Sequence, residues 1–421
     1  MRNRVARNWV AGLVGLALAV LLALPAAAAD PAAPPRPAAP ARLDKPQLAQ
    51  VLAPRLRQVT AGQPFQAYSP RWGALVVEPT ISRPLQAEAE ELLNGLKSAR
   101  AAMALVEVPS GRVLALAGVR HGRLDPGVAL DGSAPAASLY KIVTAAAAVE
   151  ETQLNPMSRL TFTGRPHSLT PNQVRIGKAR QGAQATLRES FAISNNPVFA
   201  KLGVYHIGVD LLTWYGKALG FESRLPFELP LGTSRLYDCD SDFEVAGLAS
   251  GYNSQTTISP VHAALLAGVF VNRGRLMEPY VVARVSDPAG NQLYQGRPSS
   301  LGRIVSDATC QAMQEMFEAT ITEGTARRAF HHLGQDRVLR DISLGGKTGT
   351  ISGPDKSELF EWFAGYGRDD STGRTIAVSA VVVHHSIRHA NPKQLSRQLL
   401  RAAFSGSTHV VSQRQPHGPR L

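Results

Sequence analysis

Three short motifs impose the strongest constraint on how this chain can fold. They are S-L-Y-K at residues 138–141, S-N-N at residues 194–196 and K-T-G-T at residues 347–350, and the chain contains no second S-x-x-K, S-x-N or K-T-G. An S-x-x-K is expected about once at random in a chain of this length, whereas the ordered set of three is much harder to obtain by chance. If their side chains act together, the fold must bring these distant segments into one cleft.

The S-L-Y-K motif can provide an activated serine. Residues 138–148 are apolar nearly all round, which predicts a helix buried within a domain. Because side chains three residues apart share one helix face, Ser138 and Lys141 would be neighbours. A partly desolvated lysine has a lowered pKa, so its neutral amine can remove the proton of a serine hydroxyl. The alternative for this motif alone is a helix start, with Ser138 as its cap and Lys141 in solvent.

The S-N-N motif lies in a predicted loop between an apolar stretch and Pro197. The hydroxyl of Ser194 can relay a proton to a leaving amine, and the amide of Asn196 can both donate to and accept from a peptide group. Taken alone, the motif also fits a plain helix cap.

The K-T-G-T motif lies on a predicted strand, where a lysine and two threonine hydroxyls can hold a terminal carboxylate. Strand alternation places Lys347 and Gly349 on one face and Thr348 and Thr350 on the other, so these residues do not all face a substrate equally. The two glycines before the motif would let a substrate backbone approach the edge of the strand.

The apolar pattern predicts strands towards both ends of the body and helices between them. We expect helices at residues 85–97, 260–270, 307–322 and 395–404, and strands at residues 101–106, 112–117, 344–351, 360–366 and 375–383. This order predicts an α+β fold, an α/β/α sandwich whose antiparallel sheet is built from both chain ends, with a helical subdomain inserted.

The chain ends differ in composition from the body. Three arginines, an apolar run and four alanines predict a signal peptide or membrane anchor at residues 1–29. We expect a Pro/Ala-rich linker at residues 30–60, the folded domain at 61–405 and a disordered tail at 406–421. This arrangement predicts a periplasmic or other extracytoplasmic location, either free or anchored to the inner membrane.

Charge and cysteine content add weaker constraints. The formal net charge of +13 suits an exported protein that faces an anionic cell envelope, and we expect no nucleic-acid partner. Cys239 and Cys310 allow one disulfide without requiring it. The histidine pairs at residues 331–332 and 384–385 do not supply clustered ligands, so we expect no metal site.

The ordered motifs resemble those of the transpeptidase domain of penicillin-binding proteins, members of the β-lactam-recognising serine acyl-transferases. The resemblance covers residues 75–405 and includes the segments T-I-S-R-P-L-Q at 80–86, residues 257–274, E-G-T-A at 323–326 and W-F-A-G-Y at 362–366. It implies the β-lactamase/transpeptidase-like fold, and it implies no cofactor.

The same resemblance implies a role for each motif residue. Ser138 would be the acylated nucleophile, Lys141 its base, and Ser194 and Lys347 members of a proton relay. The backbone N–H groups of Ser138 and Thr350 would form the oxyanion hole. The residues expected to bind substrate are Asn196, Thr348, Gly349 and Thr350.

These roles imply a peptidoglycan D,D-transpeptidase or D,D-carboxypeptidase that acts on D-Ala-D-Ala stem peptides through a Ser138 acyl-enzyme. The implied partners are the stem peptides, β-lactam antibiotics as covalent inhibitors, and other proteins of cell-wall synthesis. Two alternatives stay open, namely a serine β-lactamase and a non-catalytic β-lactam sensor or envelope scaffold.

One segment resembles a β-lactamase motif but lies in the wrong place. E-T-Q-L-N at residues 151–155 fits E-x-x-L-N, whose glutamate activates the deacylating water in class A β-lactamases. In those enzymes it follows the S-x-N motif, whereas here it precedes it. We therefore interpret Glu151 as part of a helix end.

Overall fold

The computed structural model describes residues 42–175, 182–385, 388 and 390–405. The signal segment expected at residues 1–29 and the tail expected at 406–421 lie outside these residues. Across the described ranges, no helix combines the length and the apolar character that crossing a membrane requires.

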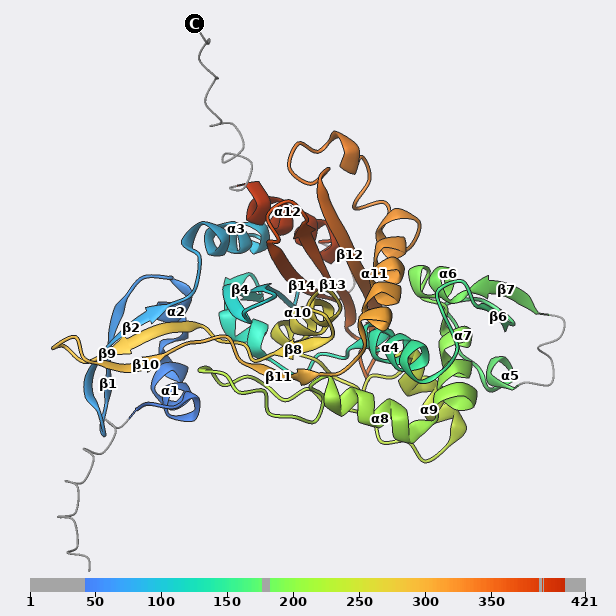
Figure 1. Cartoon of the computed structure of the whole chain (residues 1–421), viewed down its shortest axis with the longest axis horizontal. Helices are drawn as coiled ribbons and strands as arrows, with labels where there is room; N and C mark the ends of the chain where they lie inside the picture. Colours follow the sequence, from blue (N-terminus) through green and yellow to red (C-terminus); the bar gives the residue numbers. More distant parts are fainter. Residues whose placement is uncertain (1–41, 176–181, 386–387, 389, 406–421) are drawn as a thin grey trace, which may run out of the picture. The chain divides into compact units, whose positions relative to one another are not determined.

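A six-stranded antiparallel sheet forms the centre of the domain (Figure 1). Its order is β12, β13, β14, β3, β4 and β5, so the strands near the chain's end pair with those near its beginning. This confirms the predicted antiparallel sheet built from both ends. The strands are β12 (Ile342–Ser352), β13 (Leu359–Asp369), β14 (Thr375–His384), β3 (Arg100–Glu107), β4 (Arg112–Arg120) and β5 (Arg123–Leu124).

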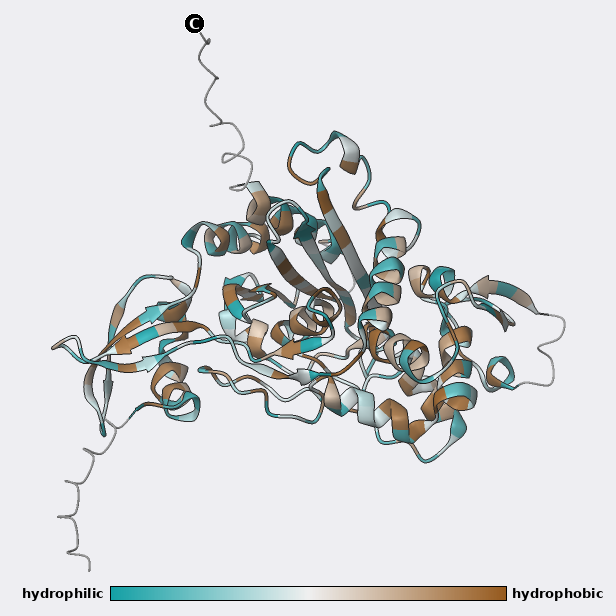
Figure 2. Ribbon diagram, viewed as in Figure 1, coloured by the Kyte–Doolittle hydropathy of each residue, from teal (hydrophilic) through white to brown (hydrophobic). Residues whose placement is uncertain are grey.

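Helices cover both faces of this sheet. α3 (Arg83–Leu93) and α12 (Pro392–Ser405) pack on one face, and α10 (Pro260–Gly268) packs on the other. Because successive strand side chains point to opposite faces, Val378, Ala380 and Val382 of β14 join one core while Ala377, Val381 and Val383 join the other. Figure 2 shows that α3 and α12 carry both hydrophilic and hydrophobic residues, whereas α10 is mostly hydrophobic, and every residue of α10 is buried.

A mostly helical region is inserted between β5 and β12, as predicted. After a short 3₁₀ helix, η2 (Pro126–Leu130), it continues with the 3₁₀ helix η3 and α4, and it packs against the edge of the sheet through α11. Its main elements are η3 (Ala137–Tyr140), α4 (Lys141–Glu151), β6 (Arg159–Phe162), α5 (Pro171–Val174), β7 (Ala183–Thr186), α6 (Leu187–Ala192), α7 (Asn196–Lys201), η5 (Leu202–Ile207), α8 (Val209–Ala218), α9 (Asp242–Ser250), η6 (Val269–Val271) and α11 (Asp307–Thr322).

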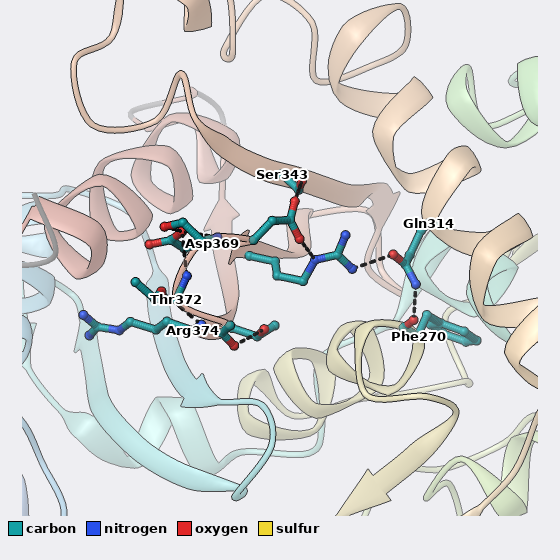
Figure 3. A network of polar contacts seen from close by, with 11 residues as sticks. Phe270, Gln314, Ser343, Asp369, Thr372 and Arg374 are labelled. Atoms are coloured by element: carbon teal, nitrogen blue, oxygen red, sulfur yellow. Dashed lines mark hydrogen bonds and ion pairs between the residues drawn. The ribbon is translucent and has the colours of Figure 1, made fainter. Parts of the chain in front are cut away.

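A polar network fastens α11 to the sheet (Figure 3). The side-chain amide of Gln314 donates to the carbonyl of Phe270 at 2.7 Å and accepts from Arg368 at 2.8 Å. Asp370 accepts from Arg368 at 2.6 Å and from the Ser343 hydroxyl at 2.7 Å. Because these groups satisfy one another, we interpret the network as structural.

The segment expected to be a linker is partly folded, which corrects the predicted boundary. α1 (Lys45–Leu52) and α2 (Leu56–Thr60) occupy the second half of residues 30–60. Pro46 lies in the first turn of α1, where proline favours helix formation. Leu48 and Leu52, one turn apart on α1, are both buried. The Lys45 ammonium donates to Glu278 at 3.0 Å, which ties α1 to a distant part of the chain.

The prediction also missed a second, smaller sheet beside these helices. It has the order β1 (Phe65–Ser69), β2 (Gly73–Pro79), β9 (Val282–Ser286) and β10 (Gln292–Gln295). A further pair of short strands, β8 (Arg275–Met277) and β11 (Ser300–Arg303), connects it with α11 along the chain. Cys239 and Cys310 are both free thiols.

Candidate active site

The S-L-Y-K motif spans the junction between a 3₁₀ helix and an α-helix. η3 holds Ser138, and α4 begins at Lys141. A 3₁₀ helix has about three residues per turn, so side chains at i and i+3 are aligned. This geometry places Lys141 Nζ 2.8 Å from Ser138 Oγ.

The backbone just before Ser138 is held by two hydrogen bonds. The indole N–H of the fully buried Trp362 donates to the carbonyl of Pro135 at 2.8 Å. The N–H of Ala136 donates to the carbonyl of Thr256 at 2.8 Å. The first contact fixes the start of η3 against β13, so the position of Ser138 depends on the packing of the sheet.

Lys141 is enclosed by oxygen atoms. Besides Ser138 Oγ, its amine approaches Asn196 Oδ1 at 2.7 Å and the carbonyl of Ser250 at 2.6 Å. Burial, with a smaller effect of Lys347, lowers the pKa of Lys141 well below its usual value. A neutral amine here can donate to the two carbonyl oxygens and direct its lone pair at the Ser138 hydroxyl.

The S-N-N motif forms a sharp turn between α6 and α7. Ser194 adopts a φ of 61°, a left-handed conformation, and Asn195 caps α7 by accepting from the N–H of Val198 at 3.2 Å. Asn196 is the first residue of α7. The turn therefore presents Ser194 and Asn196 to the same side as Lys141.

Lys347 joins this turn to β12. Its amine is fully buried and donates to Ser194 Oγ at 3.0 Å and to the carbonyl of Thr348 at 3.0 Å. Burial lowers the pKa of Lys347 to about 7. At neutral pH this amine can therefore both give and take a proton.

The three motifs surround one cavity of about 490 Å³. Its wall includes Ser138, Ser194, Asn196, Thr348 and Thr350, while Lys141 and Lys347 lie buried behind it. The fold therefore brings together the residues that the motifs predicted. Their individual roles stay predictions.

Gly349 lies between two residues of the cavity wall, Thr348 and Thr350. It is not among the residues that line the cavity. A Cβ on Gly349 would meet Ala137 Cβ at 3.2 Å and the carbonyl oxygen of Ala136 at 3.3 Å. The missing side chain therefore allows β12 to run close beside η3, and we assign Gly349 a packing function.

The cavity wall also contains residues to which the sequence analysis assigned no role. They are His167, Gly251, Tyr252, Thr325 and Lys393. Burial, then the charges of Lys141 and Lys347, lower the pKa of His167. Thr325 lies in the E-G-T-A segment that the resemblance includes, so a signal existed for it. His167 and Lys393 have no local sequence signal.

The family model for the penicillin binding protein transpeptidase domain matches residues 101–404. Among curated proteins, the chain is 27% identical over 216 residues to stage V sporulation protein D of Bacillus subtilis, covering 51% of this chain and 32% of that protein. It is 29% identical over 294 residues to the peptidoglycan D,D-transpeptidase PbpA of Mycobacterium tuberculosis, covering 66% of this chain and 56% of that protein. The chain thus spans about a third to just over half of these relatives.

Solved structures give the same result for the fold. The crystal structure of PBPA from Mycobacterium tuberculosis superposes with a TM-score of 0.63 at 20% identity, covering 79% of this chain and 80% of that one. An imipenem acyl-enzyme complex of that protein matches with the same score. At this identity the likeness shows the fold, which is the predicted β-lactamase/transpeptidase-like one.

Proposed function

Because the chain belongs to the penicillin-binding protein transpeptidase family, we propose that it is a serine D,D-transpeptidase or D,D-carboxypeptidase of peptidoglycan. The main observation behind this proposal is the pair of contacts around one cavity, Lys141 Nζ to Ser138 Oγ at 2.8 Å and Lys347 Nζ to Ser194 Oγ at 3.0 Å. Each joins a hydroxyl to an amine whose pKa is lowered by burial, so both pairs can transfer protons.

Acylation begins when the neutral amine of Lys141 takes the hydroxyl proton of Ser138. The oxygen of Ser138 then bonds to the carbonyl carbon of the penultimate D-alanine. Negative charge that develops on the carbonyl oxygen is stabilised by the backbone N–H groups of Ser138 and Thr350, an interaction of a type worth about 3 to 4 kcal/mol.

The leaving group needs a proton before the peptide bond breaks. Ser194 donates its hydroxyl proton to the nitrogen of the terminal D-alanine, and Lys347, 3.0 Å away, replaces that proton. Deacylation reverses both transfers. An incoming amine or water loses a proton through Ser194 to Lys347, and Lys141 returns its proton to the oxygen of Ser138.

The structure offers no support for rapid β-lactam hydrolysis. Glu151, from the E-x-x-L-N segment, is a helix-end residue whose carboxylate accepts a hydrogen bond from the hydroxyl of Tyr215. The described residues that line the cavity include no carboxylate. A β-lactam that acylates Ser138 should therefore stay bound, as in the imipenem acyl-enzyme of the structural neighbour.

The proposal includes an extracytoplasmic location, either periplasmic or at the inner membrane. It is supported by the arginines and apolar run of residues 1–29 and by the net charge of +13. The proposed partners are D-Ala-D-Ala stem peptides, β-lactams and other proteins of cell-wall synthesis. Fractionation of cells that express the tagged chain tests the location.

Labelling with a fluorescent penicillin tests the function. We expect a stable adduct on the wild type and none on Ser138→Ala, whose folding is checked by its melting temperature. Release of D-alanine from a pentapeptide, compared with dimer formation on intact stem peptides, then separates carboxypeptidase from transpeptidase. Rapid turnover of a chromogenic cephalosporin would instead indicate a β-lactamase, and an adduct without either peptide product would indicate a sensor.

A further inference from the structure

The cavity that holds Ser138 has a lysine at one end that none of the three motifs includes. Lys393 is the second residue of α12 and lines this cavity with Ser138 and Thr350. Its side chain is half-buried, and burial lowers its pKa. The charge of Lys393 is therefore partly removed from water beside the proposed reaction centre.

Lys393 has no counter-ion of its own among the described residues. Its ammonium makes no ion pair there, and the nearby charges that affect it are those of Glu361 and Arg388. The Glu361 carboxylate is already shared, with His384 Nε2 at 3.1 Å and an Arg388 nitrogen at 3.5 Å. A partly desolvated cation without its own partner is unfavourable, so an anion in the cavity would stabilise it.

Strand register shows at which end of the cavity Lys393 lies. Thr350 of β12 pairs directly with Glu361 of β13, and the Glu361 carboxylate contacts Arg388, which precedes Lys393 by five residues. Lys393 therefore belongs to the Thr350 end of the cavity. The Thr348 end lies two residues earlier on β12, where the Thr348 carbonyl accepts from Lys347 and the Thr348 hydroxyl contacts Thr325.

The proposed reaction gives these ends different functions. Ser194 protonates the leaving amine. Its hydroxyl oxygen accepts a hydrogen bond from Lys347, which also donates to the carbonyl of Thr348, so Ser194 lies at the Thr348 end. The leaving D-alanine and its terminal carboxylate therefore occupy that end. The part of the substrate that becomes the acyl group extends past Thr350 towards Lys393.

On the basis of the proposed function, we infer that Lys393 forms a subsite for a second carboxylate, located on the acyl portion of the substrate upstream of the scissile bond. This names the preferred substrate class as stem peptides with an acidic group in their donor portion. The contact is a charge-assisted hydrogen bond or ion pair, and it is separate from binding of the terminal carboxylate.

Two penicillins that differ by one carboxylate provide a matched probe. Carbenicillin is benzylpenicillin with an additional carboxylate on its acyl side chain. We expect Lys393→Gln to lower the carbenicillin-to-benzylpenicillin ratio of second-order acylation rates about tenfold, with the benzylpenicillin rate changed less than about twofold. Lys393→Arg should retain the ratio. Lys217→Gln, the same charge loss on an exposed residue of α8, should also retain it.

Each outcome has a defined meaning. If the ratio is the same in the wild type and Lys393→Gln, the subsite is wrong while the proposed function stands. If benzylpenicillin fails to acylate the folded wild type, the proposed function is wrong, and the subsite proposal, which rests on it, is wrong as well. If Lys217→Gln lowers the ratio equally, the effect comes from overall charge and the subsite is again wrong. A carbenicillin acylation rate that falls with added salt in the wild type, but not in Lys393→Gln, would support direct charge pairing.

Discussion

The hydroxyl oxygens of Thr325 and Thr348 lie 2.5 Å apart, which connects the turn after α11 to β12. Thr325 also donates its N–H to the carbonyl of Ala192 at 3.1 Å, and Ala192 lies two residues before Ser194 of the S-N-N turn. A Cβ on Gly324 would approach that carbonyl oxygen to 2.2 Å, so the close contact requires glycine. Thr325 therefore couples the position of Ser194 to that of Thr348.

Removing the Thr325 hydroxyl should impair acylation with little effect on stability. Thr325→Val has nearly the same shape but releases Thr348, and we expect the acylation rate with benzylpenicillin to fall about tenfold because small misplacements of substrate-binding groups slow such reactions strongly. Thr325 is exposed, so the melting temperature should change little. Thr325→Ser keeps the hydroxyl and should retain most of the rate. Equal rates for the wild type and the valine variant would contradict a positioning role.

The buried amine of Lys347 should make the free energy of unfolding depend on pH above neutrality. Its pKa is about 7 in the folded protein, against about 10.4 in an unfolded chain. Between these values the unfolded chain binds a proton that the folded protein lacks, so the free energy of unfolding rises with pH, by up to about 1.4 kcal/mol per pH unit.

Lys347→Met isolates this contribution because methionine does not titrate. We expect the variant to be the more stable protein at pH 7 and its advantage to shrink as the pH is raised to 9. Urea unfolding at pH 7, 8 and 9 measures the difference. A constant difference across this range would show that the pKa of Lys347 is not lowered by burial.

Much of the fold could be predicted because the local patterns are strong. Helix α11 was predicted at residues 307–322, the bounds that it has, and it begins with the Ser306 cap. The three late strands are long and largely buried, as strands covered by helices on both sides should be. The second sheet was missed because its strands are short and partly exposed.

The site also contains residues that could be predicted from the sequence and residues that could not. Its motif residues could be predicted because spacing and residue type together define the chemistry, as in the i, i+3 pair Ser138 and Lys141. Lys393 could not be predicted, since it reaches the cavity only because α12 packs back on the sheet. The folded part of the expected linker was missed for a similar reason, because α1 is held by the distant Glu278.

Gly251 should be essential for the geometry of Ser138. Its φ is +62°, and a Cβ at this position would lie 2.0 Å from the carbonyl oxygen of Ala137 and 3.1 Å from Ser138 Cα. Gly251→Ala must therefore displace η3 as well as strain its own backbone. We expect loss of penicillin acylation and a lower melting temperature.

Gly73 provides a matched control for this variant. Its φ is +73°, but a Cβ there would meet nothing within 4 Å. Gly73→Ala should cost only the left-handed backbone strain, about 1 to 2 kcal/mol, and should acylate normally. If both variants lose acylation to the same extent, steric displacement of η3 is not the cause.

A buried histidine that does not line the cavity should make the protein sensitive to acid. His262 Nε2 lies 2.8 Å from the carbonyl oxygen of Leu219, and Nδ1 lies 2.7 Å from Ser234 Oγ. The carbonyl can only accept, so Nε2 bears the hydrogen and Nδ1 accepts from the serine hydroxyl. Burial lowers the pKa of His262 to about 4, so the folded protein keeps the ring neutral at a pH where the unfolded chain protonates it.

This difference fixes the sign and the range of the effect. As the pH falls from about 6.5 to about 4, the unfolded chain gains a proton at His262 that the folded protein does not, and stability is lost by about 3 kcal/mol in total. His262→Gln keeps a donor and an acceptor but does not titrate, so its free energy of unfolding should fall less over the same range. Urea unfolding of both proteins at pH 6.5, 5.5 and 4.5 gives the two slopes, and the subtraction removes the carboxylate titrations that they share. If the free energy of unfolding falls with the same slope in both proteins, His262 has the same pKa in the folded and unfolded states. Its burial would then not contribute to the loss of stability in acid.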